Sequence, residues 1–194
     1  MHIAPYNNQN KPIVDVEDTC VPLNYFNIVK LKKGEAFAYQ VPGYETCIVP
    51  ATGTVDVEVE GVSYAKLGNR GVDVWDGEPE GVYVPVGAKL FTVGQGGWSG
   101  FPSHKHDTDR LPDETRHDET YNFRFRPNHG SGVQMLQRED NKPGDAYHIV
   151  DGSTICLDKG YHPCCVLPGY EMYYFTILGG LSQRSLVQYF QPIH

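Results

Sequence analysis

The chain has 194 residues and a formal net charge of −8 at pH 7, a length that allows one large domain or two small ones. The negative charge argues against nucleic acid and anionic membranes as partners, because both require a basic surface. A hydrophobic fraction of 40% and a charged fraction of 21% are typical of a soluble globular protein, and no apolar run approaches the roughly 18 residues of a membrane span.

The N-terminus and the cysteines favour a cytoplasmic protein. Residues 1–8 lack the basic and apolar regions of a signal peptide. The chain has five cysteines, an odd number with irregular spacing and no CxxC pair. We therefore expect free thiols in a reducing compartment.

Residues 1–23 are polar and carry three prolines, and we interpret them as an N-terminal arm with room for one edge strand. The clearest alternation follows at Thr54–Glu60, where three valines share one face and charged residues the other. Glu60-Gly61 is a good hairpin turn. The other strands predicted in this half are Phe26–Leu31, Glu45–Val49, Val72–Trp75, Val82–Val84 and Lys89–Val93.

A glycine-rich joint at Gly94–Gly97 precedes a second half of similar style. Its predicted strands are Glu119–Phe125, Val133–Gln137, Ala146–Val150, Thr154–Leu157 and Met172–Leu178. The 21 glycines and 14 prolines punctuate these short segments, and no amphipathic helical pattern continues for three turns. Strands and tight turns throughout predict an all-β fold.

A weak internal sequence repeat favours a fold made of two similar halves. Asp76-Gly77 and Asp151-Gly152 each lead into a strand, a tight turn and a further strand. Only the second copy carries a histidine after its last glycine, at His162. We therefore expect residues 24–93 to form a metal-free half and residues 98–194 to form the half that binds a metal.

Three imidazoles and a carboxylate come from separate segments of the second half. His104 and His106 are two apart, so on a strand both would point to the same face. Glu119 opens a strand that is aromatic on the same face, where a lone carboxylate would be costly to bury. With His162 they offer three nitrogens and one oxygen, a donor set that suits zinc, manganese, iron or nickel.

A purely structural interpretation competes with this one. His104 and His106 could be a surface pair beside Lys105, and His162 alone could be a turn histidine. Four further carboxylates are expected to be solvated, since they lie in a polar loop or on the opposite strand face: Asp107, Asp109, Glu114 and Asp118. His117, His129 and His148 are expected at the surface rather than as ligands, and Cys164-Cys165 as buried small apolar residues.

These motifs closely resemble those of the 5-deoxy-glucuronate isomerase family of myo-inositol catabolism, with the 5-keto-4-deoxyuronate isomerases as a related branch. The resemblance covers most of residues 95–182 and is weaker over 24–93. The segments that carry it are Trp98-Ser-Gly-Phe-Pro-Ser-His-Lys-His-Asp, Leu111-Pro-Asp-Glu-Thr, Glu119-Thr-Tyr, Asp151-Gly, Gly160-Tyr-His-Pro and Pro168-Gly-Tyr-Glu-Met-Tyr-Tyr.

The resemblance implies a bicupin, two cupin-like β-barrels in one chain, with one divalent metal ion in the second barrel. The ligands that it implies are His104, His106, Glu119 and His162, and zinc or manganese is favoured over iron or nickel. The chain is shorter than is usual for the family, with the shortfall near Val93–Gly97. Missing closing strands would expose sheet edges, so we expect a homo-oligomer.

The implied reaction is the aldose–ketose isomerisation of a small sugar acid, from 5-deoxy-D-glucuronate to 5-dehydro-2-deoxy-D-gluconate. The metal would polarise the carbonyl and the adjacent hydroxyl, and a base would move a proton through an enediol. Glu119, Tyr121 and Tyr174 are the candidate catalytic residues and His117 is a further candidate base, although both tyrosines could simply pack the barrel.

A substrate carboxylate requires a cation, and Arg138 is preferred over Arg124 and Arg126, because Arg124 should point away from Glu119. Asp158 stands where the family usually has proline, Asn122 where it has a second tyrosine, and Met135-Leu-Gln where it has Arg-Val-Tyr. Two other functions stay open, an iron-dependent oxygenase and a non-catalytic sugar-binding or regulatory bicupin. The polar loop 107–118 favours an enzyme, because a lid over a small substrate is a common catalytic need.

Overall fold

The computed structural model of the chain describes residues 1–38, 44–59, 62–83, 88–93, 98–100, 102–139, 142–181 and 185–192. These ranges contain β-strands and no α-helix, so the prediction of an all-β fold is confirmed. Accordingly, none of the described residues belongs to a helix of the length and apolarity that crossing a membrane requires.

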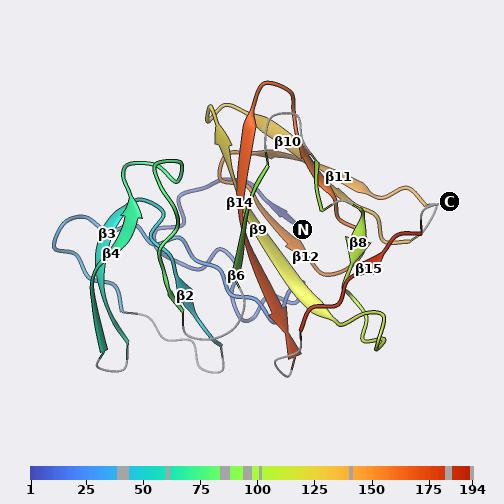
Figure 1. Ribbon diagram of the computed structural model, residues 1–194, viewed down its shortest axis with the longest axis horizontal. Helices are drawn as coiled ribbons and strands as arrows, with labels where there is room; N and C mark the ends of the chain where they lie inside the picture. Colours follow the sequence, from blue (N-terminus) through green and yellow to red (C-terminus); the bar gives the residue numbers. More distant parts are fainter. Residues whose placement is uncertain are drawn as a thin grey trace. The chain divides into compact units, whose positions relative to one another are not determined.

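One compact unit combines residues 1–38 with residues 87–194, and it contains two antiparallel sheets (Figure 1). The larger sheet has the order β1 (His2–Ile3), β12 (Thr154–Leu157), β9 (His117–Arg126), β14 (Glu171–Gly180), β6 (Ala88–Val93). The smaller sheet has the order β11 (Asp145–Val150), β10 (Ser131–Leu136), β13 (Cys164–Val166), β7 (Trp98–Ser99). A separate ribbon pairs β8 (His104–Lys105) with β15 (Tyr189–Phe190).

The main core of this unit is built by side chains from both sheets. Tyr121, Phe123 and Phe125 alternate along β9 and meet Leu136 of β10 and Ile149 of β11. Because strand side chains alternate with a period of two, one face of each sheet can be apolar and face the other sheet. The result is a closed two-layer core in which a polar inward residue such as Glu119 is surrounded by aromatic groups.

The opposite face of β9 is covered by part of the N-terminal segment. Val14 and Val21 are fully buried in a second cluster with Phe26. The side-chain amide of Asn24 donates to the hydroxyl of Thr120 on β9 over 2.9 Å. The edge strand for which the sequence left room is present as β1, paired with β12.

Residues 39–86 form a second, smaller unit. Its hairpin joins β3 (Gly53–Val59) and β4 (Val62–Arg70), and a short ladder joins β2 (Cys47–Ile48) and β5 (Val82–Tyr83). The alternation predicted for β3 is confirmed, with the valines half-buried and the charged residues exposed. The predicted turn at Glu60-Gly61 and the joint at Gly94–Gly97 lie outside the described residues.

Two predicted strands are wrong. Val72–Trp75 is a turn, because the carboxylate of Asp76 accepts the backbone N–H groups of Val72 and Asp73 at 2.8 and 2.9 Å, an arrangement that competes with strand pairing. Phe26–Leu31 forms no strand with the described residues, although Phe26 makes an isolated bridge with Val14. All five strands predicted in the second half are present, within two residues at each end.

The structure groups the chain differently from the predicted halves. Strand β6, at the end of the predicted first half, pairs with β14 of the second half, and residues 1–38 belong to the same unit. The division into an arm, a metal-free half and a metal-binding half stays a prediction about function rather than a description of these units.

Candidate metal centre

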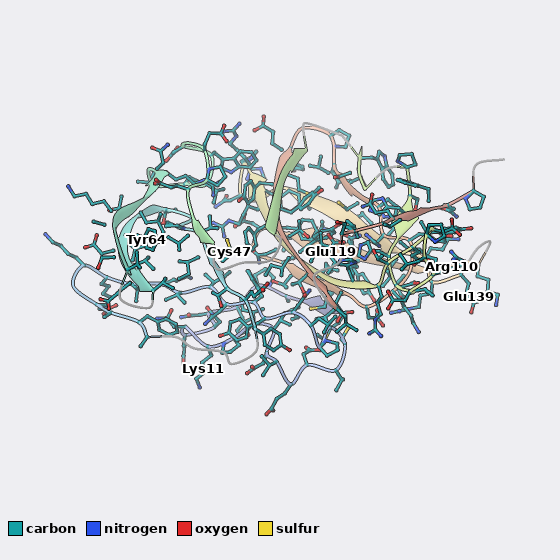
Figure 2. The ribbon with its side chains drawn as sticks, turned by 60° about the horizontal axis from the view of Figure 1, so that its bottom comes forward. Lys11, Cys47, Tyr64, Arg110, Glu119 and Glu139 are labelled. Atoms are coloured by element: carbon teal, nitrogen blue, oxygen red, sulfur yellow. The ribbon has the colours of Figure 1, made fainter. Side chains whose placement is uncertain are left out.

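His106, Glu119 and His162 meet in the interior of the larger unit. Their possible ligand atoms lie within 4.8 Å of one another and all three residues are buried. Nε2 of His106 is 3.1 Å and Nε2 of His162 is 3.2 Å from the same carboxylate oxygen, Glu119 Oε2. Figure 2 shows Glu119 among the strands. His106 follows β8, Glu119 is on β9, and His162 lies between β12 and β13.

Backbone carbonyl groups fix the orientation of both rings. His106 Nδ1 is 2.9 Å from the carbonyl oxygen of His117, and His162 Nδ1 is 2.7 Å from that of Gly160. A carbonyl oxygen can only accept, so each Nδ1 carries the proton and each Nε2 is directed at the carboxylate. This outer hydrogen bond is the usual companion of a histidine that ligates a metal through its other nitrogen.

The convergence of three acceptors fits a cation. A proton on His106 can bridge that ring to Glu119, but Nε2 of His162 is buried and finds no hydrogen-bond partner in the described part of the chain, a costly state for a polar atom. A divalent ion placed among the three groups would satisfy both ring nitrogens and the carboxylate together. Nitrogen and oxygen donors of this kind are typical of zinc, manganese and iron sites.

Burial and close contact shift the pKa values of these groups in opposite directions. Burial alone would raise the pKa of Glu119, but contact with His106 and His162 holds it well below its usual range. Burial alone would lower the pKa of His106, but the carboxylate of Glu119 raises it above the usual value. Glu119 is therefore an anion at neutral pH, and its other oxygen accepts a 2.7 Å hydrogen bond from Thr176.

A tight turn at Gly160 positions His162, and Asp107 connects this turn to the segment that carries His104 and His106. Gly160 has a φ of +99°, and a Cβ there would lie 2.7 Å from the carbonyl oxygen of Gln137, so only glycine is suited to this position. Asp107 accepts from the backbone N–H of Gly160 and from the ammonium group of Lys105, both at 2.8 Å. Burial opposes the ionisation of Asp107, but Lys105, Thr108 and Gly160 bring its pKa to about 2.

His104 lies beside this group without joining it. Its ring centroid is 5.0 Å from that of His162 and 6.3 Å from that of His106. Its Nδ1 donates to the carbonyl oxygen of Pro102 at 3.1 Å, and its Nε2 is 3.0 Å from the side-chain nitrogen of Gln188. Burial and the neighbouring His162 lower its pKa to about 4, so the ring is neutral. Its role as a ligand stays a prediction.

The two candidate tyrosines lie against each other next to the group. The ring centroids of Tyr121 and Tyr174 are 4.9 Å apart, and that of Tyr121 is 6.5 Å from His162. Burial, with the charge of Glu119 adding to it, raises the pKa of Tyr121 well above its usual value. Burial also raises the pKa of Tyr174, whose hydroxyl bonds to Ser99 at 2.5 Å. Both phenols are therefore protonated at neutral pH.

Arg138, the predicted cation for the substrate carboxylate, is paired with Asp158 at 3.0 Å. A shallow depression without room for a water molecule borders the histidines. Arg138 is absent from its lining, which consists of His106, Asp107, His117, Leu157, Asp158, Lys159, Gly160 and His162. His117 is buried rather than at the surface, whereas His129 and His148 are exposed as expected.

The expectation that the neighbouring carboxylates are solvated is wrong for Glu114 and Asp118, which are fully buried. Glu114 accepts the backbone N–H groups of Asp107 and Thr108 and pairs with Arg110 at 3.1 Å, so its charge is compensated. Loop 107–118 is therefore held in place by its own buried carboxylate. Asp107, Thr176 and Gln188 were missed as parts of the site; only Thr176 had a signal, the alternation that it shares with Tyr174.

Both the sequence and the fold are similar to those of known proteins. The model of the KduI/IolB family matches residues 2–93 and 90–194. The chain is 32% identical over 144 residues to a 5-deoxy-glucuronate isomerase from Geobacillus kaustophilus, covering 69% of this chain and 51% of that protein. It is 38% identical over 92 residues to one from Geobacillus thermodenitrificans, covering 47% and 33%. The chain thus spans about half or less of the length of these relatives.

One solved structure is also similar. An IolB-like protein from Salmonella typhimurium LT2 superposes with a TM-score of 0.63 at 20% identity, over 76% of this chain and 79% of that one. At that identity the likeness concerns the fold alone, and it agrees with the predicted all-β, two-halved cupin-like architecture.

Proposed function

The chain belongs to the KduI/IolB family, and we propose that it is a metal-dependent aldose–ketose isomerase of inositol catabolism that converts 5-deoxy-D-glucuronate into 5-dehydro-2-deoxy-D-gluconate. Relatives that carry the name 5-deoxy-glucuronate isomerase support the activity. The observation that carries the proposal is the convergence of the Nε2 atoms of His106 and His162 on one oxygen of Glu119. In that arrangement Nε2 of His162 is buried and has no hydrogen-bond partner among the described residues, a cost that a bound cation would remove.

We assign the metal ligands to His106, Glu119 and His162, with His104 as the fourth and one zinc or manganese ion per chain. A divalent ion held there would act as a Lewis acid on the substrate carbonyl and the adjacent hydroxyl. Thr176 keeps Glu119 in place by donating to the carboxylate oxygen that the histidines do not contact. Asp107 keeps the segment of His106 next to the turn of His162.

Proton transfer is assigned to residues around the ligands. Tyr121 and Tyr174 stay protonated at neutral pH, so they suit hydrogen-bond donation to a substrate oxygen better than proton abstraction. The ring centroid of His117 lies 6.3 Å from that of His106, and we assign the base to His117. Replacing His117 with glutamine should lower kcat by about 10²–10⁴-fold, the usual range for a general base, with the metal content unchanged.

We assign binding of the substrate carboxylate to Arg138, which would release Asp158 to do so. Its guanidinium is paired with Asp158, so an incoming carboxylate would displace the aspartate as a bidentate partner. Asp158→Ala should then lower KM by removing the competitor, whereas Arg138→Met should raise it. Equal KM values in both variants and the wild type would remove Arg138 from the proposal.

The decisive experiment is metal analysis of the wild-type chain and His106→Ala, run beside an isomerase assay with 5-deoxy-glucuronate. The wild type should hold one ion per chain and turn over the substrate without oxygen uptake. His106→Ala should lose both properties, and the exposed histidine variant His129→Ala should keep both. Stoichiometric metal in His106→Ala would contradict the proposed site.

The same experiment separates the rival functions. Oxygen uptake by the loaded protein would indicate an oxygenase, and metal or sugar binding without turnover would indicate a non-catalytic bicupin. Light scattering tests the homo-oligomer, which a monomeric peak would contradict. Fractionation of cells tests the cytoplasmic location.

A further inference from the structure

The C-terminal segment, residues 185–192, runs alongside the part of the chain that carries His104. Its strand β15 pairs with β8, so that Phe190 is opposite His104 and Tyr189 opposite Lys105 (Figure 1). The backbone N–H of Gln191 donates to the carbonyl oxygen of Ser103 at 2.8 Å. The C-terminal segment is therefore hydrogen-bonded to the chain directly before His104.

The segment is also anchored before Gln188. The backbone N–H of Thr115 donates to the carbonyl oxygen of Val187 at 3.0 Å, and the hydroxyl of Thr115 accepts the N–H of Val187 at 2.8 Å. The guanidinium of Arg110 lies 4.3 Å from the ring centroid of Tyr189, a distance typical of a cation–π contact. Gln188 is thus held between fixed points on both sides.

The side chain of Gln188 occupies the one free lone pair of His104. Because Pro102 accepts from Nδ1 of His104, Nε2 carries no proton and can only accept. The amide nitrogen of Gln188 lies 3.0 Å from that Nε2, and its N–H therefore donates to it. The amide cannot be reversed, because its carbonyl oxygen would then face a lone pair.

His104 differs in this respect from the two ring nitrogens that face Glu119. All three rings donate through Nδ1 to a backbone carbonyl group, which is the outer contact of a metal ligand. Nε2 of His106 and of His162 is directed at the carboxylate, but Nε2 of His104 is directed at Gln188. One lone pair cannot accept a hydrogen bond and bind a metal at the same time.

We propose that Gln188 is a positioning residue that competes with the ion for Nε2 of His104, so that this fourth ligand joins the centre only when the amide is released. The inference rests on the metal centre of the proposed function. While the hydrogen bond is made, His106, Glu119 and His162 would be the protein ligands available to an ion. Because the pairing of β15 with β8 places Gln188 next to His104, the position of the C-terminal segment affects how many protein ligands the metal can have.

The test is a cobalt(II) titration of the full chain, with dissociation constants and visible absorption as readouts. Gln188→Leu removes the donor and keeps the volume, so His104 should join and the Kd should fall by about two- to tenfold, the equivalent of one net hydrogen bond. The absorption should change toward that of a four-ligand site. Gln191→Leu, in the same segment and joined to Ser103 through its backbone N–H, should match the wild type.

A second substitution identifies the cause. In Gln188→Leu the further change His104→Ala should abolish the gain, because the gain depends on that ring. If Gln188→Leu does not fold, Gln188→Asn carries the test, since it keeps the amide but is one methylene too short to reach Nε2.

Two failures are distinguishable. A Kd for Gln188→Leu equal to or weaker than that of the wild type, while His106→Ala loses cobalt, would overturn the role of Gln188 and leave the metal centre intact. Cobalt binding by His106→Ala at the wild-type Kd would overturn the metal centre itself.

Discussion

Strand β9 and the β3–β4 hairpin show that burial does not follow composition. Every residue of β9 from His117 to Phe123 is buried, although most of them are polar. In the hairpin, apolar residues are open to solvent, with Val62 54% and Tyr64 41% exposed. Strand β9 is buried on both faces, because the core lies on one side and the N-terminal residues on the other. Polar groups become available for chemistry where two layers enclose them.

The largest expected difference between the two regions concerns stability. Phe123→Ala on β9 should lower the free energy of unfolding by about 3–5 kcal/mol, because a fully buried phenylalanine leaves a cavity. Tyr64→Ala on β4 should change it by less than about 1 kcal/mol, as for other surface positions. Urea denaturation of the two variants measures both values. Similar losses for Phe123→Ala and Tyr64→Ala would show that burial does not distinguish the two strands.

Metal affinity should separate the regions next. Glu119→Ala should weaken metal binding by about 100-fold or more, since changes in outer contacts already cost about 10–100-fold. Glu58→Gln, an exposed carboxylate of β3, is the matched control and should bind as the wild type does. Competition against a metal-sensitive dye gives both dissociation constants. An unchanged constant in Glu119→Ala would show that the buried carboxylate is not a ligand.

The N-terminal cover of β9 can be tested with one amide. Asn24→Ala removes the donor to Thr120 and should cost about 1–3 kcal/mol of unfolding free energy, because a buried hydroxyl loses its partner. Thr19→Ala, at an exposed side chain of the same segment, should be nearly neutral. A neutral Asn24→Ala would mean that the N-terminal residues do not stabilise the outer face of β9.

The strands were the most predictable part of the molecule. Those of the second half follow from alternation between turn residues, as at Thr154–Leu157, where prediction and structure coincide. The predicted strand Val72–Trp75 could have been identified as a turn, because Asp76 is placed to accept from the preceding backbone. The buried state of Asn24 could not be foreseen, since its partner Thr120 is 96 residues away.

The sequence was sufficient to predict the metal-donor residues, but not the contact of Gln188 with His104. Spacing and residue type brought out His106, Glu119 and His162, which the structure brings together. Nothing in the local sequence of Gln188 indicates that it contacts His104, because the two are 84 residues apart and meet only through the pairing of β15 with β8. Contacts of this kind depend on tertiary packing.

Acidification should produce the smallest and most gradual effect. The raised pKa of His106 means that this ring is still protonated above pH 6.5 in the metal-free protein, and a protonated ring cannot bind a metal. As the pH is lowered, metal affinity should therefore begin to fall while the pH is still above 6.5. Below the raised pKa it should drop about tenfold per pH unit, because binding displaces one proton. Isothermal titration at several pH values measures this slope, which His129→Gln should leave unchanged.

The metal-free protein should show the opposite trend. A group whose pKa is raised by folding stabilises the folded state fully below its unfolded value, near pH 6.5, and that contribution is lost as the pH rises through the folded pKa. His106 should thus make the metal-free protein less stable from about pH 6.5 upward, while the loaded protein gains stability because metal binding strengthens. If the stabilities of the metal-free and the loaded protein changed with pH in the same direction, the proton that the metal displaces would not come from His106.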